Sequence, residues 1–132
     1  MRRAIRPAAL AVAALAASAL PASALAHETV TDRGVAVTMH VLPGDEPRAG
    51  EAATIVIVKV KPRSGRFTFR RCACRIKVTS SSGRVLLDRR TGKRTPFVFP
   101  DPAAYEVTYA GTYRAKGGGT KRFSTTFAIR AN

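Results

Sequence analysis

The chain has 132 residues and carries 23 Lys and Arg against 8 Asp and Glu, a formal net charge of +15 at pH 7. This length excludes two separate cores, because the 106 residues that follow a 26-residue export signal suit a single domain. The positive charge attracts anionic polymers, acidic cell-surface groups or nucleic acid without specifying one of them. A plainer alternative is that the arginines only solvate the surface.

Residues 1–26 have the pattern of a secretory signal peptide. Three arginines come first, an apolar run follows, and small residues form a cleavage motif. The run is shorter than the ~20 residues that span a bilayer, so we expect a helical signal peptide and not a membrane anchor. We therefore expect a secreted or extracytoplasmic protein with no membrane span. The three parts are Arg2, Arg3 and Arg6, the run from Ala8 to Leu20, and Ala24-Leu25-Ala26.

The chain after Ala26 alternates short apolar stretches with turns rich in Gly, Pro and Ser, and has no long segment of helical period. This pattern predicts an all-β, immunoglobulin-like sandwich of about seven antiparallel strands over 35–132. We expect residues 27–34 to form a flexible amino-terminal segment. The expected strands are residues 35–43, 52–62, 66–78, 84–90, 97–99, 99–109 and 122–130.

Alternation within these strands predicts which side chains face the core. The inward set of the first strand is Val35, Val37, Met39 and Val41. In the last two strands, Tyr105, Val107 and Tyr109 alternate with polar residues, and Phe123, Phe127 and Ile129 share one face. In the second strand the run from Ile55 to Val58 is apolar on both faces, and then Val58 and Val60 alternate with lysines. A central strand that becomes half exposed fits this change.

The third expected strand, RFTFRRCACRIKV at 66–78, changes parity in its middle. Phe67 and Phe69 are odd positions, whereas Cys72 and Cys74 are even, so a regular strand cannot bury both sets on one face. Either a bulge at Arg70-Arg71 shifts the register, or the two halves face different layers.

Cys72 and Cys74 are the two cysteines of the chain, and their chemistry is open. Export favours a disulfide, yet Cα atoms two residues apart on a strand are roughly 6.6 Å apart, near the upper limit for a bridge. A bridge that closes three residues contributes only about 1.6 kcal/mol by chain entropy. The alternatives are buried free thiols that act as small hydrophobes, and thiolates that bind a soft metal ion or join two chains.

The stretch Asp101-Pro102-Ala103-Ala104-Tyr105-Glu106-Val107 resembles the D-x-A-x-Y-x-C signature of immunoglobulin-like domains. The resemblance implies a tyrosine corner, in which the Tyr105 hydroxyl bonds to the upstream backbone. Val107 stands where the signature has cysteine, so the resemblance implies no inter-sheet disulfide of the antibody type.

The layout of residues 35–130 is similar to that of small exported bacterial domains of the YtkA-like group. The shared features are His40-Val41-Leu42-Pro43, Gly50-Glu51 before the second strand, and a proline shortly before Tyr105. This resemblance implies a binding or accessory role without catalysis.

Copper is the alternative function that the sequence suggests. Cleavage after Ala26 makes His27 the first residue, which resembles the amino-terminal histidine of exported copper proteins. Imidazole and amine nitrogens suit Cu(II), and His40 is the other histidine of the chain. The candidate copper ligands are His27 and His40, with Cys72 and Cys74 as further candidates.

Basic residues are the better guide to a partner, because 13 of the 20 that follow Ala26 fall between Lys59 and Arg94. On a sheet, Lys59, Lys61, Arg75 and Lys77 are expected to share a solvent face suited to an anionic polymer. No nucleophile with a base, carboxylate pair or phosphate-binding glycine loop assembles, so we expect no enzyme. The expected function is an exported binding or accessory module for an anionic surface or polymer.

Overall fold

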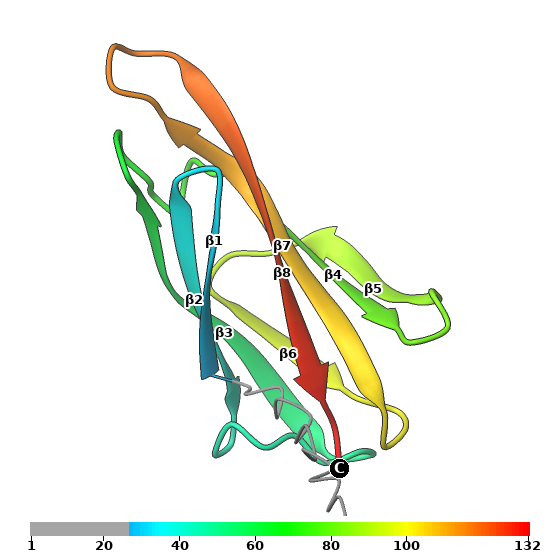
Figure 1. Ribbon diagram of the computed structural model, residues 1–132. Helices are drawn as coiled ribbons and strands as arrows, with labels where there is room; N and C mark the ends of the chain where they lie inside the picture. Colours follow the sequence, from blue (N-terminus) through cyan, green and yellow to red (C-terminus); the bar gives the residue numbers. More distant parts are fainter. Residues whose placement is uncertain (1–26) are drawn as a thin grey trace, which may run out of the picture.

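The computed structural model describes residues 27–132, and the expected signal peptide lies outside the described residues. Every element in this part is a β-strand, and Figure 1 shows the strands as two layers. The all-β prediction is confirmed, with eight strands in place of about seven. They are β1 (His27–Asp32), β2 (Val35–Leu42), β3 (Ala52–Pro62), β4 (Arg75–Ser80), β5 (Val85–Arg90), β6 (Arg94–Val98), β7 (Ala104–Arg114) and β8 (Thr120–Arg130).

The strands form two four-stranded antiparallel sheets. The first has the order β1-β2-β3-β6, and the second has the order β5-β4-β7-β8. The chain crosses between the sheets after β3, after β5 and after β6, so neighbours in sequence repeatedly lie in opposite layers (Figure 1). Strands β7 and β8, of 11 residues each, form a hairpin that extends beyond the rest of one end.

The extra strand is β1, which replaces the flexible segment expected at 27–34. Its residues pair with β2 from His27 opposite His40 to Asp32 opposite Val35. The connecting turn places Arg33 and Gly34 at φ 47° and 79°, as a tight hairpin turn of primed type requires. HETVTD lacks apolar alternation, and Val30 is its one aliphatic side chain that packs on the core. Backbone pairing with β2 therefore orders a segment whose side chains predict no strand.

The core lies between the two sheets and is made by alternating positions of the strands. The inward faces predicted for β2 and for the end of the chain are confirmed, since these side chains are fully or almost fully buried. Burial of this apolar surface is the main contribution to stability. The buried sets are Val35, Val37, Met39 and Val41 on β2, and Phe123, Phe127 and Ile129 on β8.

A bulge in β3 turns Val58 toward solvent, so the predicted inward face of this valine is wrong. Thr38 pairs with Lys59 and Met39 pairs with Ile57, so Val58 is an extra residue between two pairs. Val58 is 42% exposed, whereas Val60 returns to the core at 9%. The bulge moves two consecutive residues to the solvent side and resets the alternation.

The bounds predicted for the third strand, 66–78, are also wrong, because β4 begins only at Arg75. Residues 63–74 form a connection that crosses to the other sheet, and within it Arg66 makes an isolated β-bridge with Arg114. The two phenylalanines of this connection are half-buried, and the Phe67 ring lies 5.0 Å from Phe69 and 5.8 Å from Phe123. The change of parity between Phe69 and Cys72 therefore lies within this connection, before the strand begins.

Candidate functional site

The cysteines form a disulfide in a tight turn that we call the cystine turn, residues 69–74. The Cα atoms of Cys72 and Cys74 are 5.0 Å apart, closer than in an extended strand. Ala73 between them has φ 46°, in the left-handed region, and this conformation shortens the chain. The bend in the backbone that brings the sulfurs together is therefore at Ala73, and not at Arg70-Arg71 where the bulge was predicted.

Backbone contacts fix the cystine turn to its neighbours. The Cys72 carbonyl accepts hydrogen bonds from the Thr112 N–H at 2.8 Å and from the Thr112 hydroxyl at 3.1 Å. The Cys74 carbonyl accepts from the Thr91 N–H at 3.0 Å. The turn is therefore held on β7 on one side and on the connection between β5 and β6 on the other.

Gly111 on β7 makes room for the disulfide. A Cβ at this position would lie 2.5 Å from the Cys74 Sγ and 3.0 Å from the Cys72 carbonyl oxygen. The sequence analysis missed this residue, although a glycine inside a strand often marks a close approach.

Burial of the disulfide removes the cysteines from the predicted copper ligands. Cys72 and Cys74 are 1% and 2% exposed, and both sulfurs are used in the bridge. A metal-binding cysteine has to be a free thiolate. The assignment of Cys72 and Cys74 as ligands, and the alternative of buried free thiols, are therefore wrong for this structure.

The histidines lie in the other sheet. His27 on β1 is directly opposite His40 on β2 in the antiparallel register. The His40 Nδ1 lies 3.1 and 3.3 Å from the two carboxylate oxygens of Asp45, which also accepts from the Val41 N–H at 3.3 Å. Among the side chains that the structure describes, from Glu28 onward, no group of three or more His, Cys, Asp and Glu is arranged to hold a metal ion.

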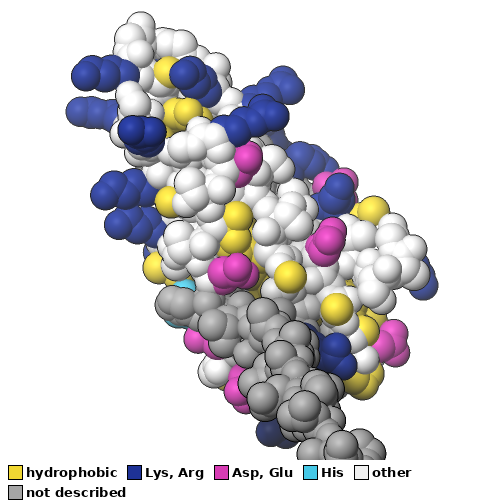
Figure 2. Space-filling view, in the orientation of Figure 1, with side chains coloured by type: hydrophobic (Ala, Val, Ile, Leu, Met, Phe, Trp, Pro, Cys, Tyr) yellow, Lys and Arg dark blue, Asp and Glu magenta, His cyan; other side chains and the backbone are white. Residues whose placement is uncertain are grey.

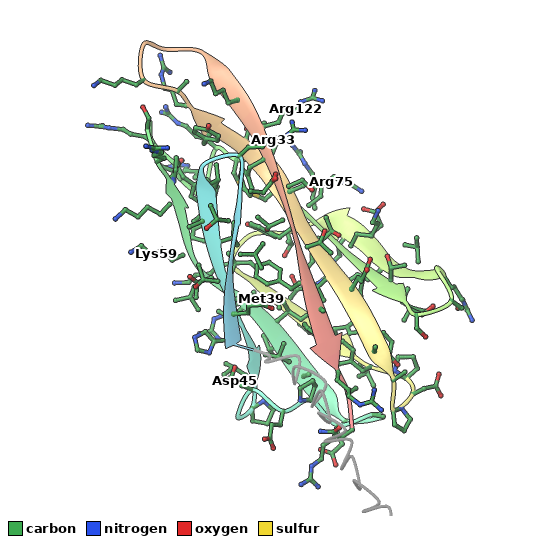
Figure 3. The ribbon with its side chains drawn as sticks, in the orientation of Figure 1. Arg33, Met39, Asp45, Lys59, Arg75 and Arg122 are labelled. Carbon is green, nitrogen blue, oxygen red and sulfur yellow. A yellow bond between two sulfur atoms is a disulfide. The ribbon has the colours of Figure 1, made fainter. Side chains whose placement is uncertain are left out.

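The four basic residues predicted to share a solvent face do not share one. Lys59 and Lys61 are on β3 and Arg75 and Lys77 are on β4, so the two pairs lie on the outer faces of opposite sheets. Figure 3 shows Lys59 and Arg75 on opposite sides of the molecule. Arg75 is also paired with Asp88 at 3.1 Å. The prediction failed because it assumed that consecutive strands are neighbours.

Basic residues from distant parts of the sequence meet instead at one end of the molecule. This basic end consists of the turn between β1 and β2, the connection at 63–74, and the tip of the β7–β8 hairpin. In Figure 2 the dark blue side chains gather around this end, and the magenta acids lie mainly toward the other. Asp45, Glu46 and Glu51, in the connection between β2 and β3, contribute to the opposite end.

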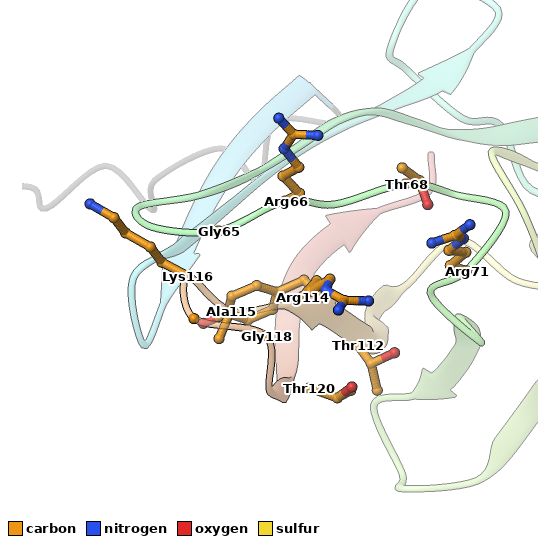
Figure 4. Close-up of a pocket in the computed structure, with 12 residues that line it drawn as sticks. Gly65, Arg66, Thr68, Arg71, Thr112, Arg114, Ala115, Lys116, Gly118 and Thr120 are labelled. Carbon is orange, nitrogen blue, oxygen red and sulfur yellow. The ribbon is translucent and has the colours of Figure 1, made fainter.

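The basic end contains a concavity of about 890 Å³, which we call the hairpin hollow. Residues 65–71 line one side, and residues 112–120 of the β7–β8 hairpin line the other (Figure 4). Neither Asp nor Glu is among its described lining residues. Its cationic side chains are Arg66, Arg71, Arg114 and Lys116, and all four are exposed.

Two further hollows adjoin the hairpin hollow. One, of about 570 Å³, shares Thr112 with it, and its charged lining residues are Asp32, Arg33, Arg75 and Arg122. The other, of about 450 Å³, shares Arg71 with it and contains Arg70 and Arg90. Ala73 lines both of these smaller hollows. The cystine turn is thus surrounded by three concavities with arginines.

Two buried tyrosines hold loops through their hydroxyl groups. The Tyr105 hydroxyl donates to the Asp101 carbonyl at 2.6 Å and accepts from the Asp101 N–H at 2.9 Å, which is the backbone contact that the resemblance implies. The Tyr109 hydroxyl donates to the Gly92 carbonyl at 3.2 Å. Burial raises the pKa of Tyr109, so its hydroxyl keeps the proton that it donates.

Residues 27–132 contain no helix that is long and apolar enough to cross a membrane. No protein-family model matches the chain, and comparison with curated proteins and with solved structures finds no significant match.

Proposed function

We propose that this protein is a secreted binding module, without catalytic activity, that attaches to an anionic polymer or anionic cell surface through its basic end. The observation that carries the proposal is the hairpin hollow, which four cationic residues line with no carboxylate among the described lining residues. Unneutralised positive charge in a concavity attracts polyanions and raises their rate of association. Export is supported by the signal-peptide pattern of residues 1–26.

The same proposal places the domain among immunoglobulin-like sandwiches of the YtkA-like group. The strand order, with crossings between sheets after β3, β5 and β6, is compatible with an immunoglobulin-like arrangement. The bonded hydroxyl of Tyr105 supports it further. In such sandwiches the loops gather at the two ends, so a binding site at one end is a usual use of the fold.

A comparison of two fourfold variants tests the binding face. The first replaces Arg66, Arg71, Arg114 and Lys116 with glutamine, and the second replaces Lys59, Lys61, Lys77 and Arg84, none of which lines a hollow of the basic end. Both changes remove four charges from exposed positions. We expect the first variant to elute from heparin and from DNA at clearly lower salt, with a salt slope lower by about 3, because each lost phosphate contact lowers the slope by about 0.7 to 0.9.

The second variant is the matched control, and we expect it to retain most of the affinity of the wild type. Equal losses in the two variants would show that net charge alone governs binding. Wild-type protein that passes through both columns at low salt would contradict the proposed function.

Copper binding is the second candidate, and the register of β1 with β2 favours it. His27 and His40 are directly opposite each other on adjacent strands, and the His40 Nδ1 lies 3.1 Å from an Asp45 carboxylate oxygen. Cleavage after Ala26 would add the α-amine of His27 to these groups. Amine and imidazole nitrogens with a carboxylate form a donor set that suits Cu(II).

Titration of Cu(II) into three proteins tests this candidate. The first begins at His27, the second carries one extra glycine before His27, and the third is His40→Gln in the first background. If copper is the ligand, both changes weaken binding by about tenfold or more, since each removes a nitrogen donor. Equal weak binding in all three proteins would remove copper from consideration.

A further inference from the structure

We propose that the hairpin hollow binds a tetrahedral oxyanion, the phosphate or sulfate ester group of the polymer, and selects it over a carboxylate. This inference rests on the proposed function and names the chemical group that it recognises. It depends on the number of cations in the hollow, on their distribution over two walls, and on how those walls are fixed.

The hollow is lined by more hydrogen-bond donors than one carboxylate can engage. Three of its cations are guanidinium groups, which are always protonated and present N–H donors in a rigid fork. Thr68 and Thr120 add hydroxyl donors to the lining. A phosphate or sulfate ester offers up to three terminal acceptor oxygens, against two in a carboxylate, so it matches this number of donors better.

The donors come from two walls. Arg66 and Arg71 belong to the connection at 63–74, and Arg114 and Lys116 belong to the β7–β8 hairpin (Figure 4). A planar carboxylate has two oxygens that diverge in one plane and suits a single guanidinium fork. A tetrahedral oxyanion has oxygens that diverge in three dimensions, so it can accept hydrogen bonds from both walls at once.

The two walls are fixed to each other before any ligand arrives. The Arg66 N–H donates to the Arg114 carbonyl at 2.8 Å, and the Arg114 N–H donates to the Arg66 carbonyl at 2.9 Å. Gly65 has φ 106° and lies so close to Arg114 that a Cβ there would collide with the Arg114 carbonyl. A preorganised site loses less entropy when it binds.

The cystine turn restricts Arg71, the second cation on the wall formed by the connection at 63–74. Arg71 directly precedes Cys72, whose carbonyl is held by two hydrogen bonds from Thr112, and the Arg71 N–H donates to the Thr68 carbonyl at 3.2 Å. The disulfide thus limits the conformations open to the backbone that carries Arg71. We assign the cystine turn a positioning role, in which its sulfurs take no part in chemistry.

The adjoining hollows extend the site along a polymer. The hollow that shares Arg71 adds Arg70 and Arg90, and the one that shares Thr112 adds Arg33 and Arg122. Successive phosphate or sulfate groups of one chain would therefore meet further arginines on either side of the central group. Binding should strengthen with polymer length until these positions are filled.

The test measures binding by isothermal titration calorimetry at low salt with three probes of matched length: inorganic polyphosphate, heparin and poly-L-glutamate. The site variant is Arg71→Gln with Arg114→Gln. The control is Arg63→Gln with Lys121→Gln, which removes the same charge from exposed positions outside the hollow. Circular dichroism shows whether each variant keeps the fold.

We expect the wild type to bind polyphosphate or heparin about tenfold or more tightly than poly-L-glutamate. The site variant should lose most of that preference, with affinity for the favoured probe lower by about a hundredfold or more, since both lost guanidinium groups donate charge-assisted hydrogen bonds. The control should lose only a few fold. Arg71→Lys with Arg114→Lys, which keeps the charge, should still lose the preference because lysine has no fork.

The remaining outcomes separate the two proposals. A preference for polyphosphate alone or heparin alone supports the site and identifies the source of the oxyanion. Equal affinity for all three probes overturns the oxyanion site while the general polyanion function stands, and so do equal losses in the site variant and the control. Absence of binding to any probe overturns both proposals.

Discussion

Replacing Gly111 with alanine is expected to lower the free energy of unfolding by about 1 to 3 kcal/mol, the usual range for overpacking a tight core. The added methyl group would meet the Cys74 Sγ at 2.5 Å and the Cys72 carbonyl oxygen at 3.0 Å. Neither atom can move easily, because the sulfur is bonded to Cys72 and the carbonyl is held by Thr112. Chemical denaturation of the oxidised protein measures the loss.

Gly92→Ala is the matched control for this experiment. A Cβ at Gly92 meets nothing within 4 Å, and no positive φ favours glycine there. We expect a change of less than about 0.5 kcal/mol, or slight stabilisation through the lower entropy of the unfolded chain. If Gly111→Ala were as stable as Gly92→Ala, the close approach of the cystine turn to β7 would be wrong.

Tyr105→Phe is expected to destabilise the domain by about 1 to 2 kcal/mol. The substitution removes a hydroxyl that bonds both the carbonyl and the N–H of Asp101, while the ring keeps its packing on Phe99 at 5.0 Å. Tyr105 is 3% exposed, so water does not readily replace the lost hydroxyl. Thermal unfolding of the variant beside the wild type measures the effect.

Tyr113→Phe provides the comparison, since Tyr113 is only half-buried and lies at the edge of the core. We expect its effect to be within about 0.5 kcal/mol. Equal stabilities for Tyr105→Phe and the wild type would mean that the corner at Asp101 adds nothing to the fold.

The disulfide is better explained by position than by stability. A disulfide that closes a loop of three residues contributes only about 1.6 kcal/mol through chain entropy. Disulfides that close longer loops contribute more. Two neighbouring residues on β7 accommodate the disulfide. Gly111 has no side chain where the disulfide packs, and Thr112 donates a hydrogen bond to the Cys72 carbonyl. The arginines that flank it line the hollows of the basic end. These facts agree with a turn that presents arginines.

The candidate site could be predicted only in part. The sequence indicated a basic binding surface, and the structure contains a basic concavity. The residues predicted for this surface were Lys59, Lys61, Arg75 and Lys77, because they occupy alternating positions in two expected strands that follow each other in the sequence. The hairpin hollow instead joins Arg66 and Arg71 to Arg114 and Lys116, more than 40 positions later in the chain. No periodic pattern within one segment reports a contact of that range.

The sequence by itself determined the features that depend on local chemistry. Alternation of apolar residues in β2, β7 and β8 identified the strands and their buried faces, because a pleated strand points successive side chains in opposite directions. Tertiary structure decided everything that depends on which strands are neighbours. The pairing of β1 with β2 ordered a segment without an apolar pattern, and the bulge at Val58 reset a face. The chain crosses to the other sheet between β3 and β4, so the lysines of β3 and the basic residues of β4 lie in opposite sheets. Hydrogen bonding between strands and packing between sheets depend on which segments are close in space, and separation along the sequence does not specify this.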